Sequence, residues 1–285
     1  MVNIAYAGPE EREEIAQFMN VVFHKAKWDI DGWRRLLAGR WCGPDGRYAI
    51  SVRDDGKLVG VLGLVYADRM TSGGLRTTAD MTSWYILKEY RGQGIGQKML
   101  ALATSDPTVT VTNFSSAKAA VSVLVSAGLT VLDKERLVWH PRVTPSGLIV
   151  HDDPLSLGDR LPAKDRKIIG DHQGLKLRHL AVETPDGPVA MVLYPQNKHG
   201  DWVTHEIMYL GNQPLFAQYA PQIAAAVLPE RDAILSLDRR FAAEGIIPDE
   251  VRPFATPRYC QPGLLHPSEI DMLYSECVLL NIKIH

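Results

Sequence analysis

Three glycines at alternate positions lie between an apolar, strand-like run and a helix-like run, in the segment Arg91-Gly92-Gln93-Gly94-Ile95-Gly96. Because glycine has no side chain, the backbone of such a turn can approach a bound molecule closely. The free N–H groups at the start of the following helix, together with the positive end of its dipole, favour an anion. The spacing therefore indicates a cradle for a phosphate or pyrophosphate group.

Two familiar phosphate loops do not fit this segment. A dinucleotide-binding loop requires Gly-x-Gly-x-x-Gly, and a P-loop ends in Gly-Lys-Ser/Thr. The segment instead resembles the acetyl-CoA motif Arg/Gln-x-x-Gly-x-Gly/Ala of the GNAT superfamily of N-acetyltransferases, with Tyr90 and the apolar run Tyr85-Ile86-Leu87 in front of it. The resemblance extends from about Ile4 to His140, where the expected order of strands and helices agrees with the GNAT fold.

The resemblance implies roles for the residues around the cradle, with acetyl-CoA as the acyl donor. Backbone groups of the strand before the turn would pair with the pantetheine arm as a neighbouring strand does, and one amide there would polarise the thioester carbonyl. Backbone N–H groups from Gln93 to Gln97 would hold the pyrophosphate. The implied donor-binding residues are Trp84, Tyr85, Ile86, Arg91, Gly92, Gln93, Gly94, Ile95, Gly96, Gln97 and, as a pantetheine contact, Asn113.

A second family motif is only partly kept. GNAT enzymes often read Asn-x-x-Ala-x-x-x-Tyr-x-x-x-Gly-Phe, with a tyrosine that protonates the departing thiolate. Anchoring on Gly128-Leu129 places Ala120 at the alanine and Leu124 at the tyrosine. Either another hydroxyl acts, or the thiolate leaves unassisted, which a thiol pKa of about 8.5 tolerates near neutral pH. The nearby hydroxyls are those of Ser115, Ser116 and Ser122.

Transfer to nitrogen requires a base, because an amine attacks only in its neutral form. GNAT enzymes commonly use a Glu or Asp near the start of the strand that precedes the cradle. Counting back from Tyr90 places Asp80 there, between Ala79 and Met81. Asp80 is therefore the candidate catalytic base, the alternative being a strand-entry residue that faces solvent.

The second half of the chain has no Arg-x-x-Gly-x-Gly. Its equivalent stretch, Tyr209-Leu210-Gly211-Asn212-Gln213-Pro214, contains a proline, which removes an N–H from any cradle. We interpret this half as a degenerate GNAT-like lobe that does not bind CoA and that shapes either the acceptor cleft or a subunit interface, such as that of a homodimer. The polar residues on its expected strands are interpreted as structural rather than catalytic: His205, Glu206, Arg258 and Tyr259.

Both halves show the order strand, Asp-Gly turn, strand, strand, helix, strand, which predicts an α/β (α+β) fold with a mixed, mostly antiparallel GNAT-type sheet in each. The predicted domains are 1–142 (acetyl-CoA-binding), 143–162 (linker) and 163–285 (degenerate lobe). The predicted strands include Arg76–Leu87, Val109–Val111, Leu129–Leu132 and Arg136–His140. The predicted helices include Gly94–Thr104, Ser116–Ala127 and Pro267–Cys277.

Composition excludes several other classes. The formal net charge is -2, without the clustered Lys and Arg that nucleic acid requires. Three scattered cysteines form neither a disulfide framework nor a metal motif, and the histidines show no ligand spacing. Neither a signal peptide nor a membrane-spanning run is recognisable. We therefore expect a cytoplasmic protein without a metal, a nucleic-acid partner or a membrane partner.

Three functional hypotheses follow. The first is an N-acetyltransferase that moves an acetyl group directly from acetyl-CoA to a small polar amine. Its two-lobed layout resembles tandem GNAT proteins, some of them associated with bacterial cell-surface polysaccharides, which favours an amino sugar as acceptor. The second is an acyl-CoA-binding sensor or scaffold without turnover, which Leu124 in place of tyrosine favours. The third is an acetyltransferase for protein amines.

Overall fold

The computed structural model describes residues 1–43, 46–142, 146–197, 202–228 and 232–284. These residues form two compact units. The first unit contains Met1–Val131, Arg258–His266 and Tyr274–Ile284, and the second contains Leu132–Pro257 and Pro267–Leu273. This division differs from the contiguous domains 1–142 and 163–285 expected above, because two C-terminal segments pack with the first unit.

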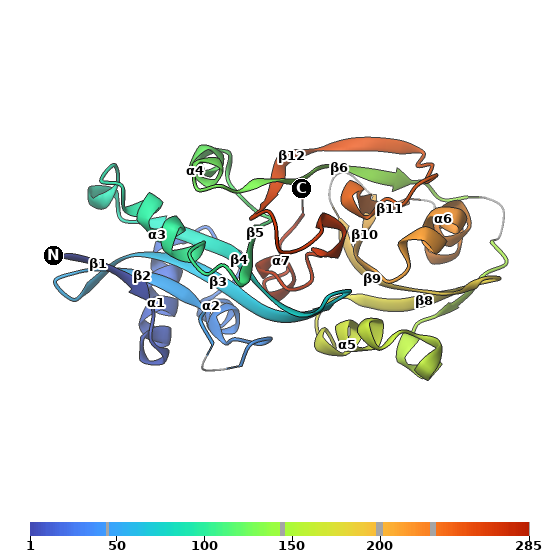
Figure 1. The fold of residues 1–285 in the computed structure, drawn as a ribbon, viewed down its shortest axis with the longest axis horizontal. Coiled ribbons are helices and arrows are strands. Elements are labelled where there is room, and N and C mark those ends of the chain that lie inside the picture. Colours follow the sequence, from blue (N-terminus) through green and yellow to red (C-terminus); the bar gives the residue numbers. More distant parts are fainter. Residues whose placement is uncertain (44–45, 143–145, 198–201, 229–231, 285) are drawn as a thin grey trace. The chain divides into compact units, whose positions relative to one another are not determined.

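The first unit is built on a sheet with the strand order β1-β2-β3-β4-β5, followed by the end of β12 (Figure 1). Neighbouring strands are antiparallel except for β4 and β5, which are parallel and joined through a helix. The strands are β1 (Val2–Tyr6), β2 (Ala49–Asp54), β3 (Lys57–Thr71), β4 (Gly74–Ile86), β5 (Val109–Asn113) and β12 (Glu250–Cys260).

Helices cover both faces of this sheet. The strands carry apolar side chains on each face, and each set packs against helices. Ile50 and Val52 of β2 pack with α3 and α4, whereas Ala49 packs with α1 and α2 on the opposite face. The helices are α1 (Arg12–Val22), α2 (Ile30–Leu37), α3 (Ile95–Ala103), α4 (Val121–Ser126) and the short α7 (Glu276–Leu279), with 3-10 turns at Pro9–Glu11, Lys88–Tyr90 and Lys118–Ala120.

The second unit has the strand order β6-β11-β10-β9-β8-β7, and among its described residues β10 and β11 pair in parallel while the other neighbouring strands pair antiparallel. Its strands are β6 (Thr130–Trp139), β7 (Ile149–His151), β8 (Arg178–Thr184), β9 (Gly187–Asn197), β10 (Val203–Leu210) and β11 (Ala233–Asp238). Its helices are α5 (Ala163–Asp171) and α6 (Gln213–Val227), with 3-10 turns at Pro154–Arg160, Arg239–Phe241 and Pro267–Glu269.

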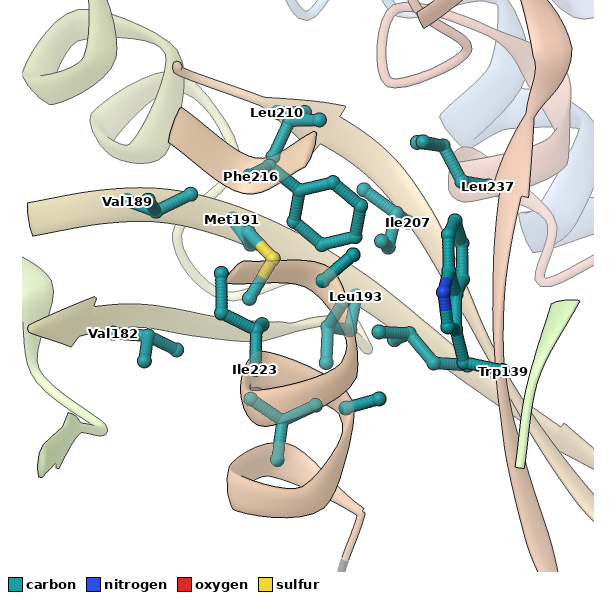
Figure 2. Packing of buried hydrophobic residues seen from close by; sticks show 14 of the residues in the cluster. Trp139, Val182, Val189, Met191, Leu193, Ile207, Leu210, Phe216, Ile223 and Leu237 are labelled. Atoms are coloured by element: carbon teal, nitrogen blue, oxygen red, sulfur yellow. The ribbon is translucent and has the colours of Figure 1, made fainter. Parts of the chain in front are cut away.

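Helix α6 supplies the central packing of the second unit (Figure 2). Its Phe216 and Ile223 are fully buried against Met191 and Leu193 of β9, and the Phe216 ring meets Trp139 edge-on at 5.5 Å. Burying one such side chain is worth about 1.5–3 kcal/mol. Helix α6 (Gln213–Val227) thus has a structural role that its apolar face explains.

The two units repeat one topology, as the internal pattern predicted. In each, three antiparallel strands (β2-β3-β4 and β8-β9-β10) lead through a helix to a parallel fourth (β5 and β11). The final strands are exchanged between the repeats. Most of β6 belongs to the second unit, where it pairs with β11, and the end of β12 belongs to the first, where Tyr259 and Cys260 pair with β5.

Four expected elements differ from those observed. Leu129–Leu132 and Arg136–His140 form one continuous strand, β6, and the helix expected over Ser116–Ala127 begins only as a 3-10 turn at Lys118. The helix expected over Pro267–Cys277 is wrong. Only the 3-10 turn Pro267–Glu269 forms, because the Asp271 side chain accepts a hydrogen bond from the Leu273 N–H at 2.9 Å and turns the chain before α7.

Candidate active site

The glycine-rich turn has the backbone that its spacing predicts. Gly92 and Gly94 have φ values of +77° and +73°, a left-handed conformation that other residues adopt only with strain. Gly94 is the N-cap of α3 and has no side chain with which to cap it. The first N–H groups of the helix, at Ile95, Gly96 and Gln97, have no partners within the helix and are open to an anion.

Gly96 has a different role from the other two glycines. It lies inside the first turn of α3, where an added Cβ would come within 2.6 Å of the Trp84 ring. Its missing side chain therefore lets the indole of Trp84 pack directly on the start of the helix. The third glycine of the motif holds β4 against α3, whereas the first two shape the turn.

The side chains of the turn fold back onto the strand that precedes it. Arg91 donates a hydrogen bond from Nε to the carbonyl of Ile86 at 2.8 Å, and its guanidinium lies 5.1 Å from the centre of the Tyr85 ring. Gln93 donates to the carbonyl of Glu89 at 3.0 Å. These contacts brace the turn. Gln93 also lines a surface hollow beside α3, together with Val2, Ile4, Ile95, Lys98 and Leu102.

The pairing between strands β4 and β5 ends halfway along β4. Their pairing runs from Thr77 with Val109 to Asp80 with Thr112, although β4 continues to Ile86. Asn113 spans the start of the gap by donating from Nδ2 to the carbonyl of Met81 at 2.9 Å. The edge of β4 that includes Trp84, Tyr85 and Ile86 is therefore not paired with β5.

A bulge in β4 marks the same place. Opposite Leu62 of β3 the register shifts by one residue between the pairs Gly63–Thr82 and Val61–Tyr85. Ser83 has a φ of +47°, which is unusual for a residue other than glycine. Bulges redirect the backbone next to functional sites, and this one bends β4 where it borders a cavity.

A cavity of about 580 Å³ opens in the first unit at this bend. Met81, Thr82, Ser83 and Trp84 of β4 form part of its wall, and Asn113 closes the end of β5. Other parts of the wall come from the end of α1 and the following loop, from α2, and from the loop Ser115–Ala120. The volume lies within the roughly 300–1,000 Å³ of ligand pockets.

Glu276 is the acidic residue in the wall of this cavity. It is 4 % exposed, and burial raises its pKa from an ordinary value of 4.5 to about 7, although a hydrogen bond from Ser115 opposes the shift. A carboxylate that titrates near neutral pH suits a general base. Sequence reasoning missed Glu276, because nothing near it in the chain marks it and it reaches the site from the C-terminal segment.

Asp80, the base expected from sequence, lies behind the cavity rather than in its wall. It is 1 % exposed on β4, accepts a hydrogen bond from Thr112 at 3.3 Å, and accepts one from the backbone N–H of Glu276 at 3.4 Å. Burial, and then the nearby charge of Glu276, raise its pKa well above its usual range. This geometry places Asp80 where it can hold Glu276 at the start of α7.

Leu124 lies in the cavity wall at the position where the family motif has tyrosine. Of the three serines considered as alternatives, Ser115 and Ser116 line the cavity, and Ser122 is not among the lining residues. The Ser115 hydroxyl donates to a carboxylate oxygen of Glu276. The structure thus brings one hydroxyl and one carboxylate together at the unpaired edge of β4.

The equivalent junction of the second unit is closed. The side chain of Asn212 caps α6 by accepting from the Leu215 N–H at 3.1 Å, and Pro214 lies in the first turn. Glu206 forms a buried ion pair with Arg136 at 2.7 Å, and burial lowers the pKa of His205 to about 4. Arg258 and Tyr259, assigned above to the second half, pack with the first unit.

Among the residues that the structure describes, no group of three or more His, Cys, Asp or Glu side chains is arranged to hold a metal ion. None of the described helices combines the length and apolar character that a membrane crossing requires.

Comparisons with known proteins place this geometry in context. Residues 12–106 match the model of the family described as "Acetyltransferase (GNAT) family". No curated protein matches the chain. Solved structures share its fold at low identity, including a GCN5-related N-acetyltransferase from Anabaena variabilis ATCC 29413 (13 % identity, TM-score 0.58, covering 91 % of this chain and 72 % of that one).

Two further structures resemble it to a similar degree. One is a probable N-acyltransferase from Enterococcus faecalis V583 (13 % identity, TM-score 0.56, 91 % and 72 % covered), and the other is a GCN5-related N-acetyltransferase from Kribbella flavida (11 %, 0.55, 91 % and 71 %). At these identities the likeness shows the fold alone. The family match covers residues 12–106, which lie within the first unit and include β4, where the pairing with β5 ends.

Proposed function

We propose that the protein transfers an acetyl group from acetyl-CoA to the primary amine of a small molecule, with Glu276 as the general base. The observation that carries this proposal is the coincidence, in one unit, of a glycine cradle, an unpaired strand edge and a cavity whose wall contains a carboxylate with a raised pKa. Trp84, Tyr85 and Ile86 would bind the pantetheine arm, and the N–H groups at the start of α3 the pyrophosphate.

Glu276 and Ser115 can carry out the proton transfers that acetylation of an amine requires. Glu276 takes one proton from the substrate ammonium, and the neutral amine attacks the thioester carbonyl. The N–C bond forms and the C–S bond breaks, and the second amine proton passes from the nitrogen of the tetrahedral intermediate to bulk water as the thiolate departs. Ser115, hydrogen-bonded to Glu276, is placed to pass a proton to the thiolate sulfur and recover one from the protonated carboxyl. Asp80 acts in this scheme as a positioning residue, through the N–H of Glu276.

The acceptor that sequence reasoning favoured is an amino sugar. The sensor without turnover is a second candidate, because Leu124 in the cavity wall offers no acidic hydrogen. Both proposals require one donor site per chain, in the first unit, and they differ in whether bound acetyl-CoA is consumed.

Calorimetric titration with acetyl-CoA, followed by assay of thiol release with a panel of amines, tests the proposal. We expect one site per chain and amine-dependent release of CoA. Binding without release for any amine would support the sensor instead. Two sites per chain would contradict the reading of the second unit, and no binding would remove the donor assignment altogether.

A further inference from the structure

The walls of the cavity differ in chemistry from one end to the other. On the side of β4 and β5, polar residues such as Thr82, Asn113 and Ser116 border the unpaired strand edge. On the side of α1, α2 and the loop between them, the wall contains the apolar residues Val22, Phe23, Ala26, Trp28 and Trp33, with His24 and Lys25 also in the lining. The donor's pantetheine arm has a place along β4, so the apolar wall is left for the acceptor.

The aromatic rings of this wall form one packed group. Trp28 meets Trp33 edge-on with ring centres 5.2 Å apart, and Phe23 lies 5.3 Å from Trp33 and 5.5 Å from Tyr85. Neither indole Nε1, of Trp28 or of Trp33, makes a hydrogen bond to the described residues. Both Nε1 atoms are also buried, so the two indoles contribute carbon rather than their N–H groups to the surface of the wall.

Gly32 of α2 helps to fix the position of Trp28. An added Cβ at Gly32 would lie 2.6 Å from Cδ1 of the Trp28 ring, closer than real atoms approach. The ring can rest on α2 only because this residue is glycine. The apolar wall is consequently supported from behind by helix α2.

The charges around the cavity limit the number of amines that it can accept. Glu276 is the acidic residue of the lining, and the basic residues His24 and Lys25 also border the cavity. A second ammonium group on the acceptor would find no further carboxylate in the lining and would be repelled by Lys25. An acceptor with one amine, directed at Glu276, fits this distribution.

We infer that the acceptor is a primary amine carried on an apolar, ring-sized body, rather than an amino sugar. This inference rests on the acetyltransferase proposed above. The hydroxyls of a sugar would lose water against Phe23, Trp28 and Trp33 without gaining hydrogen bonds, which is unfavourable. An apolar cavity of about 150 Å³ already accommodates benzene, so about 580 Å³ has room for a ring beside the thioester.

The test compares two probe amines in the thiol-release assay, 2-phenylethylamine and glucosamine, at saturating acetyl-CoA. We expect kcat/KM for 2-phenylethylamine to exceed that for glucosamine by at least about tenfold, the scale on which apolar pockets discriminate. Trp28→Ala should lower kcat/KM for 2-phenylethylamine about tenfold and leave that for ethylamine, which is too short to reach the rings, unchanged. The dissociation constant of acetyl-CoA should not change.

Trp202→Ala is the matched control, because Trp202 is a 42 % exposed indole of the second unit and lies outside the cavity. Its replacement should leave kcat/KM unaltered for both 2-phenylethylamine and ethylamine. Should Trp28→Ala fail to fold, Gly32→Ala tests the same wall by displacing the ring, and the same loss is expected. Equal or faster acetylation of glucosamine would overturn the inference while leaving the acetyltransferase intact. Failure of every amine to release CoA from protein that binds acetyl-CoA would overturn both.

Discussion

The two units contain the same strand–turn–helix junction, and only one of them is open to a ligand. At the β4–α3 junction, Gly94 caps the helix without a side chain and leaves the first N–H groups free. At the β10–α6 junction, Asn212 occupies the cap with its own carboxamide and Pro214 lacks an N–H. The fold therefore provides the junction, and two or three residues decide whether it can bind an anion.

A similar contrast separates the buried carboxylates of the two units. Glu206 is buried in the second unit and forms an ion pair with Arg136 at 2.7 Å. Glu276 lies in a cavity wall with a hydroxyl as its hydrogen-bond partner and a pKa raised to about 7. A buried carboxylate without a cation is costly to ionise, so its pKa is raised. In a cavity, a carboxylate with a raised pKa is a candidate for exchanging protons with a ligand.

Replacing Glu276 should have the largest effect. Glu276→Gln keeps the shape and removes the base, so kcat should fall by roughly 10²–10⁴-fold, the usual contribution of a general base. In the wild type, kcat/KM should rise with pH and level off above about 7, because the carboxylate must be unprotonated. Rates measured from pH 5.5 to 8.5 check this. A variant that keeps both the wild-type rate and its pH profile would exclude Glu276 as the base.

The same substitution should stabilise the fold, in a way that depends on pH. The pKa of Glu276 is raised in the folded state from 4.5 to about 7, so the wild type loses stability as pH rises through this range and the buried group ionises. The shift corresponds to about 3 kcal/mol. Glu276→Gln has no group to ionise, and its stability relative to the wild type should grow by that order between pH 4.5 and 8.

Urea unfolding at several pH values measures this difference. Glu206→Gln is the contrasting variant, because it removes one partner of a buried ion pair and leaves Arg136 uncompensated, and it should destabilise the second unit. A stability difference between Glu276→Gln and the wild type that does not change with pH would show that Glu276 is not buried as a titrating carboxyl.

The conformation of the glycine turn was predictable from the sequence, whereas the position of Glu276 was not. Gly92, Gly94 and Gly96 lie within five residues of one another, so their spacing alone specified a turn with a free helix start. Glu276 reaches the site from a segment separated from Asp80 by 196 positions. Its arrival depends on the turn at Asp271 and on the packing of the C-terminal segment with the first unit, neither of which leaves a periodic signal.

The exchange of final strands was unpredictable for the same reason. The runs Leu129–Leu132 and Arg136–His140 were recognisable as strand-like, but the partner of a strand is set by pairing with residues far away in the chain. In the structure Trp139 pairs with Leu235, and Tyr259 pairs with Asn113. Domain boundaries drawn from local composition therefore missed the C-terminal segments that complete the first unit.

Changing the cap glycine should weaken donor binding by an intermediate amount. Gly94→Ala forces a Cβ into a backbone with φ +73°, at a cost of about 1–2 kcal/mol, and reshapes the first turn of α3. We expect the dissociation constant of acetyl-CoA to rise about tenfold. Gly128→Ala is the matched control, since Gly128 has φ +90° and similar open surroundings at the end of α4. Equal loss of affinity in both variants would trace the effect to general destabilisation.

The smallest expected effect tests the closed junction. Asn212→Ala removes the cap of α6 and should lower the free energy of unfolding by about 1 kcal/mol, whereas Asn212→Gly should cost only a few tenths. Neither variant should gain a second acetyl-CoA site in calorimetric titration, because Pro214 still withholds an N–H and Gly211 remains packed against Asp165. If Asn212→Gly bound a second acetyl-CoA, one cap residue would be the whole difference between the two junctions, and the second unit would have lost its donor site by that change alone.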